Sequence, residues 1–335
     1  MFGWFVFGCG VLCAQNERIP GWQPEVREEF YPSSADGTLQ PTLLYDPRSK
    51  EPAPLLVALH TWGGNHKQAE PAYSEWCIRK GWVFVHPEFR GANTKPSACG
   101  SELVVQDILS VVEWAKQKTL VDPKRIYLIG ASGGGYASML MAGRAPEVWA
   151  GVSAWCGIFD LRDWHAKHRG GPYGRAIEAA CGGAPGTDSL VDEEYRKRSA
   201  SAWLENAKGL PVDINAGIFD GHKGSVPVSH SLKAFNVLSD SSGRVTEAEI
   251  SLMTEKPEVP EELLFKGMDP LYKKWNVLFR RISQNSRVTL FQGGHEIVHV
   301  AGLAWLEQQR KGQAAVWEVP VSEMDLSDKS TESGK

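Results

Sequence analysis

The sequence has little of the material that several large classes of protein require. Lysine and arginine number 36 against 40 acidic residues, which gives a net charge of −4, and no basic stripe of the kind that binds nucleic acid is visible. No phosphate-binding glycine-rich loop with its lysine is present, and the six cysteines contain no Cys-x-x-Cys pair. His295 and His299 have helical spacing but lack the His-Glu-x-x-His pattern of a zinc site. We therefore expect no nucleic-acid partner, no metal and no cofactor.

Long apolar runs are also scarce. Residues 1–14 are almost wholly apolar, but about 20 residues are needed to cross a bilayer, so we expect no stable membrane span. The length suits the core of a signal peptide, although the usual basic leader is missing. We expect a secreted or periplasmic protein; if residues 1–14 instead form a buried strand, it would be cytoplasmic. Cleavage after this segment would leave four cysteines, either as two disulfides or as buried thiols: Cys77, Cys99, Cys156 and Cys181.

Strand-like and helix-like runs alternate along the chain, which predicts an α/β protein with a mostly parallel sheet and helices on both faces. We expect one catalytic domain over residues 20–312, eight strands in the sheet, and a disordered tail at residues 320–335. Residues 27–31 and 39–44 flank an Asp-Gly pair and predict an antiparallel hairpin at the front. Two long excursions, at about 160–211 and 240–286, interrupt the alternation, and the first is expected to form a cap.

The most informative motif follows the apolar run at residues 125–129. Residues 130–134 read Gly-Ala-Ser-Gly-Gly, and a helix-like segment comes directly afterwards. In a nucleophile elbow a buried strand ends in a turn so tight that only very small residues fit beside the serine, which then stands exposed. We predict that Ser132 is a nucleophile.

A serine hydroxyl needs a base within hydrogen-bond reach and a carboxylate to orient that base. In folds with this elbow the acid and then the histidine follow at the ends of later strands. Residues 212–219 read as a strand that ends at Asp220, and residues 287–291 read as a last strand before His295. Asp220 and His295 are the predicted acid and base.

Other residues compete for these roles. Asp160 follows a strand at the place where some hydrolases keep their acid, and His299 lies one helical turn beyond His295. His222 and His230 fall after Asp220, where solvation in a loop and helix explains them without a catalytic role. Asp213 lies within a strand, from which it should point toward the wrong end of the sheet.

The sequence also predicts where a developing oxyanion would be held. One backbone N–H should come from the residue after the nucleophile, Gly133, and the other from the loop after the third strand. That loop, residues 60–65, reads His-Thr-Trp-Gly-Gly-Asn and resembles the His-Gly-x-Gly loops of esterases. We expect the second donor to be the amide of Trp62, with Thr61 as the alternative.

Several short motifs resemble the catalytic domain of the prolyl oligopeptidase family of α/β-hydrolases, and the likeness covers most of residues 45–310. The Pro-Glu-Phe-Arg-Gly stretch at residues 87–91 resembles that family's aromatic-Arg-Gly turn, and residues 132–136 resemble its Ser-Tyr-Gly-Gly-Tyr with glycine in place of the first tyrosine. Three further segments resemble the helix after that turn, the lead-in to the elbow and the loop beyond the acid: residues 107–114, 121–126 and 224–231. The resemblance implies an α/β-hydrolase fold and the triad roles; it does not fix the substrate.

The sequence departs from the prolyl oligopeptidases in ways that favour esters. About fifty residues precede the third strand, too few for the β-propeller that restricts those peptidases to short peptides. No double-glutamate motif for holding a free amino terminus is evident. Single-domain relatives of this style include secreted carbohydrate esterases. Trp155 beside the site, with Tyr136 after the elbow, could line a substrate pocket, where a flat ring stacks on a sugar or covers an acyl chain.

The sequence as a whole predicts a serine hydrolase that cleaves carboxylic esters through an acyl-enzyme, acting on an acylated carbohydrate or another small ester. A serine peptidase of the prolyl oligopeptidase type, using the same three residues, is the first alternative. A non-catalytic binding protein built on a hydrolase scaffold is the second.

Overall fold

A computed structural model describes residues 18–320 of the 335-residue chain. The predicted signal peptide at residues 1–14 and all but the first residue of the predicted tail lie outside the described residues, so both stay predictions. Among residues 18–320, no helix combines the length and the apolar character needed to cross a membrane.

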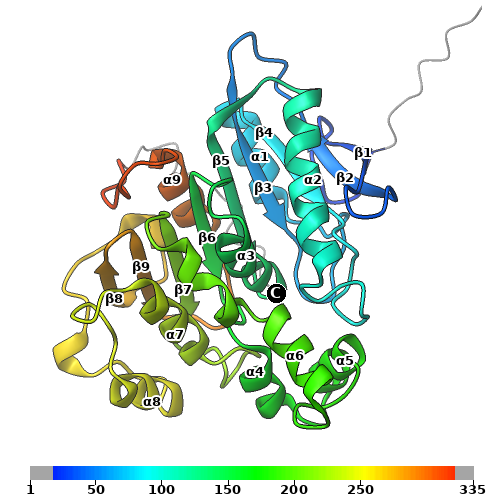
Figure 1. The fold of residues 1–335 in the computed structure, drawn as a ribbon. Helices are drawn as coiled ribbons and strands as arrows, with labels where there is room; N and C mark the ends of the chain where they lie inside the picture. Colours follow the sequence, from blue (N-terminus) through cyan, green and yellow to red (C-terminus); the bar gives the residue numbers. More distant parts are fainter. Residues whose placement is uncertain (1–17, 321–335) are drawn as a thin grey trace, which may run out of the picture.

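The described chain is organised around a nine-stranded sheet with the order β1-β2-β4-β3-β5-β6-β7-β9-β8 (Figure 1). The strands are β1 Arg27–Pro32, β2 Leu39–Tyr45, β3 Ala53–Leu59, β4 Val83–Pro87, β5 Val121–Ala131, β6 Gly151–Trp155, β7 Val212–Gly217, β8 Val277–Ser283 and β9 Ser286–Phe291. The central strands from β4 to β9 pair in parallel, whereas β1, β2 and β8 pair antiparallel at the two edges. The mostly parallel α/β sheet and the front hairpin are as the sequence predicts.

Strand order places a crevice at the carboxyl ends of the central strands. After β3 the chain pairs outward to β4 and then returns to the other side of β3 as β5. The connections after β3 and after β5 therefore leave the sheet in opposite directions, and ligands of open α/β sheets bind in the gap at such a switch point.

Helices cover both faces of the sheet, and each face has its own hydrophobic core. Helices α1 Pro71–Lys80 and α9 His299–Gln308 lie against one face, where Trp76, Cys77 and Trp305 are buried. Helices α2 Glu102–Lys118, α3 Gly133–Arg144 and α7 Val228–Leu238 cover the opposite face (Figure 1). Central strands buried on both faces are mostly apolar, which explains the apolar run of β3.

The first excursion folds into a group of helices at one end of the sheet (Figure 1). It contains α4 Leu161–His168, α5 Pro172–Cys181 and α6 Ser189–Arg198, followed by the short 3-10 helices Ala200–Ala202 and Leu204–Ala207. Trp164 of α4 packs edge-on against Trp62, with ring centroids 4.6 Å apart. The excursion is thereby anchored beside the loop that follows β3.

The second excursion contains the strand that makes the sheet nine-stranded, so the expected number of eight is wrong. After α8 Glu247–Glu255 and the short helices Glu261–Leu263 and Pro270–Tyr272, β8 pairs with β9 along its length. Arg280 and Arg281 interrupt the apolar pattern of β8. An edge strand tolerates such charges, because one side of it is not paired with another strand.

A buried ion pair joins β7 to β9. Asp213 and Arg287 are direct partners in the strand register, and Arg287 Nε lies 2.7 Å from Asp213 Oδ1. Asn215 donates to the other carboxylate oxygen at 2.8 Å. The carboxylate of Asp213 therefore has partners on both oxygens, as a charge at zero exposure requires.

Candidate active site

Ser132 occupies the sharp turn between β5 and α3. Its backbone φ of 56° and ψ of −118° are unusual for a residue with a side chain. The turn is held on both sides, since the Ser132 amide donates to the Trp155 carbonyl and the Tyr136 amide donates to the Ser132 carbonyl, each at 2.8 Å. The strained conformation presents the serine at the end of the strand, as in a nucleophile elbow.

The glycines around Ser132 are required by close backbone approaches. A Cβ atom on Gly130 would overlap the backbone of Gly134, and one on Gly134 would overlap the Leu59 carbonyl. A Cβ on Gly133 would overlap the backbone nitrogen of Trp62. The absence of side chains therefore lets the elbow dock directly against the loop after β3.

The predicted acid and base lie side by side. Asp220 comes three residues after β7 and His295 four residues after β9, and these strands are parallel neighbours. His295 Nδ1 lies 2.7 Å from Asp220 Oδ2. The amides of Gly221 and Val226 donate to Asp220 Oδ1 at 2.9 and 3.0 Å. The buried carboxylate is thus fully bonded and holds the imidazole with Nε2 turned away from it.

Ser132 and His295 line the same cavity, which has a volume of about 340 Å³. No hydrogen bond between the two side chains is present in the described structure, and such bonds are often long before a substrate is bound. The wall also contains Cys156, Glu70 and Trp275. Serine, imidazole and buried carboxylate therefore meet around a space able to hold a small acyl group.

The loop after β3 offers one free backbone donor toward the elbow. The Thr61 amide donates to Gln68 Oε1 at 3.0 Å, and the Thr61 hydroxyl donates to the same oxygen at 2.8 Å. The Trp62 amide, by contrast, has no acceptor among residues 18–320 and lies against Gly133. Of the two predicted donors in this loop, the geometry favours Trp62 over Thr61.

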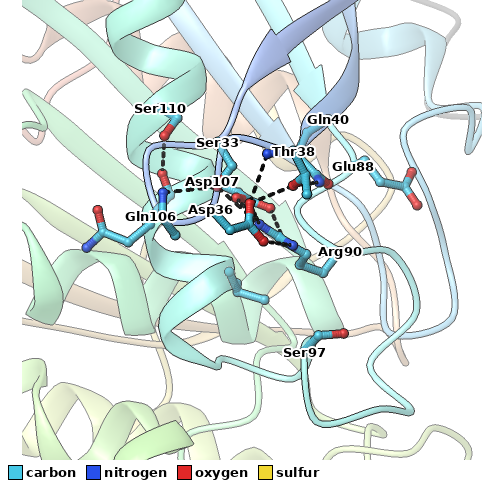
Figure 2. A network of polar contacts seen from close by, with 12 residues as sticks. Ser33, Asp36, Thr38, Gln40, Glu88, Arg90, Ser97, Gln106, Asp107 and Ser110 are labelled. Carbon is cyan, nitrogen blue, oxygen red and sulfur yellow. Dashed lines mark hydrogen bonds and ion pairs between the residues drawn. The ribbon is translucent and has the colours of Figure 1, made fainter.

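Arg90 fixes the neighbouring loop, which follows β4. Its guanidinium contacts Asp107 of α2 through Nε at 2.6 Å and Nη2 at 3.0 Å, and Asp36 of the β1–β2 turn through Nη1 at 2.8 Å. Figure 2 shows these groups converging with Ser33 and Thr38. Hydrogen bonds to Arg90 hold the pKa of the Asp36 carboxyl well below its usual range. The loop is thereby attached to a helix and a hairpin at once.

The loop held by Arg90 supports the oxyanion loop directly. Phe89 stacks on His60 with ring centroids 3.9 Å apart and an interplanar angle of 10°. His60 Nε2 lies 2.9 Å from the Glu88 carbonyl oxygen. Asn93 donates to the Trp62 carbonyl from its backbone at 2.9 Å and from its side chain at 3.2 Å. The position of the Trp62 amide therefore depends on residues 88–93.

The competing carboxylates have other partners. Asp160 caps α4 by accepting the amides of Arg162 and Asp163 at 2.8 and 3.2 Å, and it accepts the Ser201 hydroxyl at 2.6 Å. Asp213 is bound in the ion pair with Arg287 inside the sheet. Neither makes a hydrogen bond to His295.

The structure also shows where the competing histidines lie. His222 Nε2 lies 2.9 Å from the Thr254 carbonyl oxygen, away from the elbow. His230 is not solvated, contrary to expectation: it is buried in α7, and its Nδ1 accepts the Phe159 amide at 3.1 Å. His299 opens α9 and lines the same cavity as Ser132, with Nε2 3.3 Å from Glu70 Oε2.

The two predicted pocket residues lie in the core and not in the cavity wall. Trp155 is fully buried, and its indole N–H donates to the Ser153 hydroxyl at 2.8 Å. Tyr136 is buried under the cap, where its hydroxyl donates to the Arg198 carbonyl at 2.6 Å. The last residue of a buried strand and the first turn of a buried helix both face neighbouring elements, so proximity in sequence to the site misleads here.

The wall contains residues that the sequence did not single out. Cys156 follows β6, and its sulfur, an Asp220 oxygen and a His295 nitrogen all lie within 4.8 Å of one another. Three such atoms could hold a metal ion, but burial raises the pKa of the Cys156 thiol well above its ordinary value, which disfavours the thiolate that a metal requires. The four cysteines of the catalytic domain are all free and buried.

Comparisons with known proteins agree with this geometry. Residues 74–256 match the model of the prolyl oligopeptidase family. The chain is 25% identical over 222 residues to the acylamino-acid-releasing enzyme of Rattus norvegicus, covering 59% of this chain and 28% of that protein. It is 26% identical over 131 residues to an acetylxylan esterase of Coprinopsis cinerea, covering 34% and 35% of the two chains. The chain thus spans only about a third or less of the curated relatives it matches.

Solved structures share the fold. The acylaminoacyl peptidase of Pyrococcus horikoshii superposes with a TM-score of 0.51 at 22% identity, over 64% of this chain and 34% of its own. A puromycin-hydrolyzing peptidase of Mycobacterium tuberculosis superposes with a TM-score of 0.58 at 15% identity, over 86% and 40%. The architecture is therefore that of an α/β-hydrolase.

Proposed function

Because the chain belongs to the prolyl oligopeptidase family, a family of serine hydrolases, we propose that it cleaves an acyl bond through a covalent intermediate on Ser132. The observation on which this rests is the shared cavity, lined by a serine at a strained elbow and by a histidine paired with a buried carboxylate. This combination supports nucleophilic catalysis better than a binding role, since binding needs neither the strain nor the paired imidazole.

In the proposed mechanism His295 is the general base. Its Nδ1 is bonded to Asp220, which leaves Nε2 to take the proton from Ser132 as the serine oxygen attacks the substrate carbonyl. Asp220 keeps the imidazole in this tautomer and stabilises its positive form. The same histidine returns the proton to the leaving group and then activates the water that releases the acyl-enzyme.

The carbonyl oxygen becomes negative as the tetrahedral intermediate forms. We assign the amides of Gly133 and Trp62 to this charge, because they lie together at the elbow and the Trp62 amide has no acceptor in the described structure. Donors fixed in advance stabilise the transition state without reorganising, and each contributes roughly 100- to 1,000-fold in rate.

Peptide substrates, with the amino group either free or acylated, come first among the candidates. Two curated relatives are acylamino-acid-releasing enzymes, of which this chain matches about a quarter. This is contrary to the preference for esters that the sequence favours. The cavity of about 340 Å³ would accept one residue of a short peptide.

Ester hydrolysis is the second candidate, and the acetylxylan esterase relative supports it. An acetyl or another small acyl group fits the same cavity, and the chemistry at Ser132 would be identical. Esters are the easier substrates for such a site, because their leaving group needs less help from a proton donor.

A parallel assay tests the reaction and its substrate class. Short-chain nitrophenyl esters, acetylated xylan, a proline-containing peptide amide and N-acetylalanine 4-nitroanilide would be incubated with the protein and with Ser132→Ala. Ser242→Ala, which alters an exposed serine in the turn after α7, is the matched control. We expect turnover in the protein and the control, and none in Ser132→Ala.

Labelling with a serine-directed phosphonate separates the remaining outcomes. We expect one label, located on Ser132 by mass spectrometry of the digested protein. Amide turnover would assign the protein to the peptidases, and turnover of esters alone to the esterases. A folded protein that neither labels nor turns over any substrate would overturn the proposal.

A further inference from the structure

Beside the proposed triad, the cavity contains a second polar pair. Glu70 immediately precedes α1, and His299 is the first residue of α9. These two helices pack together on the same face of the sheet, which brings both side chains into the wall that also contains Ser132. The mechanism proposed above uses neither residue.

The Glu70 carboxylate is ionised and weakly bonded. It occupies the N-cap position of α1, but its side chain does not cap the helix. Its Oε1 lies 3.4 Å from Gln68 Nε2, and its Oε2 lies 3.3 Å from His299 Nε2. Burial alone would raise the pKa of Glu70, but the interaction with His299 outweighs it and the pKa is lowered. The carboxylate therefore retains capacity for a strong donor.

His299 is buried and lacks hydrogen-bonded partners. The residue is 8% exposed, and its ring packs edge-on against Tyr73 with centroids 4.9 Å apart. Neither ring nitrogen makes a hydrogen bond of good geometry within residues 18–320, since the contact with Glu70 is close but misaligned. A buried polar group without a partner is costly, so a ligand that supplies one would bind favourably.

The charges of the cavity wall favour a cation. Glu70 and Glu296 contribute two carboxylates, and Lys274 contributes one ammonium group. Glu296 already accepts the Gly294 amide, and Lys274 Nζ lies 5.1 Å from the centre of the Trp275 ring. Of the two carboxylates, that of Glu70 has the longer hydrogen bond, and it lies next to the imidazole of His299.

We propose that Glu70 and His299 form a subsite for a protonated amino group of the substrate, so that the enzyme prefers acyl donors with a free amine near the bond it cleaves. This inference rests on the proposed cleavage at Ser132. An ammonium group donates up to three hydrogen bonds and brings a positive charge, so it can donate both to the Glu70 carboxylate and to a ring nitrogen of His299 that has no hydrogen-bond partner. An N-acetylated amine has a single neutral N–H and cannot do the same.

Matched substrates that differ only at the amine test the subsite. The 4-nitroanilides and methyl esters of alanine, leucine and phenylalanine would be compared with their N-acetyl forms. We expect kcat/KM to be at least tenfold higher for the free amines. In Glu70→Gln this preference should fall about tenfold, which corresponds to about 1.4 kcal/mol of binding to the charge. Glu70→Asp, which keeps the charge on a shorter side chain, should retain part of the preference.

The control variant removes a similar charge elsewhere. Glu247→Gln changes an exposed residue at the start of α8 and should leave the ratio of free to acetylated substrate unaltered. Thermal unfolding of each variant verifies that the fold is intact. An equal preference for acetylated substrates, or a ratio that Glu70→Gln does not change, overturns the subsite.

Calorimetry on Ser132→Ala separates this inference from the proposed function. Binding of alaninamide but not of N-acetylalaninamide, lost on adding Glu70→Gln, would support the subsite even if no substrate is turned over. Absence of alaninamide binding together with phosphonate labelling of Ser132 in the unmodified protein would overturn the subsite and leave the reaction in place. A sugar alcohol that binds in preference to alaninamide would also overturn it, because it would identify a hydroxyl site.

Discussion

At the scale of single residues, the site depends on a few positions where the backbone leaves no room. Ser132 has a positive φ, and Gly133 lies so close to the Trp62 nitrogen that any side chain would displace it. Strain of this kind costs about 1–3 kcal/mol at each position and persists only where the surrounding structure enforces it. The elbow is enforced by the packing of β3 and β5 beneath it.

Gly133→Ala should therefore damage catalysis much more than its size implies. The new methyl group would push the Trp62 amide away from the elbow, and we expect kcat to fall at least 100-fold, as for the loss of one oxyanion donor. Gly63→Ala is the matched control, since a Cβ there meets nothing within 4 Å. The measurement is kcat on the best substrate of the parallel assay. Equal rates in the two variants would remove the Trp62 amide from its assigned role.

The two candidate acids can be separated by the same substitution. Asp220→Asn should lower kcat by about 10⁴, the loss seen in triads whose aspartate can no longer fix the histidine tautomer. Asp160→Asn should keep activity within severalfold, because asparagine still caps a helix. Steady-state kinetics of both variants decides the assignment, and a larger loss in Asp160→Asn would reverse it.

At the scale of elements, the loop after β4, residues 88–93, connects the front hairpin and α2 to the oxyanion loop, residues 60–65. Arg90 connects the first two, and Phe89 and Asn93 contact the third. Arg90 touches neither the cavity nor the elbow, so any effect on the reaction must pass through the position of residues 60–62. We regard it as a positioning residue.

Arg90→Leu combined with Asp107→Leu separates stability from positioning. Arg90→Leu alone leaves the buried Asp107 carboxylate unpaired and should cost about 3–5 kcal/mol of unfolding free energy. The double variant should recover most of this stability. Its kcat should nevertheless stay about tenfold below that of the unmodified protein, with KM little changed, because Arg90 no longer fixes the loop after β4. Urea unfolding and steady-state kinetics check the two effects.

Asp36→Asn is the control for the Arg90 contacts, because it alters only the exposed partner of Arg90 and should change kcat by less than twofold. A double variant with full kcat would contradict the positioning role and leave Arg90 a purely structural residue.

What the sequence could predict at this scale follows from how local each feature is. The elbow could be predicted because five adjacent residues define it. The contact of Asp220 with His295 could be predicted because both residues lie just beyond the ends of parallel strands. Strand β8 was missed because an edge strand lacks the continuous apolar pattern. Glu70 was missed because it reaches the site only through the packing of α1 against α9, which no local pattern encodes.

At the scale of the whole molecule, buried histidines couple stability to pH, and His86 and His230 have the largest shifts in pKa. Burial lowers the pKa of His86 to about 3 and that of His230 to about 4, from an ordinary value of 6.5. Between these values the unfolded chain binds protons that the folded protein does not. Their contribution to stability is therefore complete above pH 6.5 and is lost as the pH falls.

The unfolding free energy should fall by about 1.4 kcal/mol per pH unit for each of these histidines between pH 6 and pH 4.5. His230→Asn keeps an acceptor for the Phe159 amide but does not titrate, so it should reduce the slope by about one proton. Urea unfolding at a series of pH values measures it. Burial would lower the pKa of His66, but hydrogen bonds to Glu88 and Glu28 raise it, so His66 adds stability as the pH falls. This effect is the same in the unmodified protein and in His230→Asn, and it does not alter the difference between them.

The ion pair between Asp213 and Arg287 has a further consequence for accuracy of assembly. The two residues face each other inside the sheet, while the acid and the base lie beyond the far ends of the same two strands. A slip of two residues would keep every apolar side chain on its proper face, so hydrophobic burial alone would not reject it. It would, however, separate Asp220 from His295 by about 6.6 Å and leave two charges buried apart. The ion pair thus fixes the register of β7 against β9, because a misaligned and inactive sheet would be too unstable to persist.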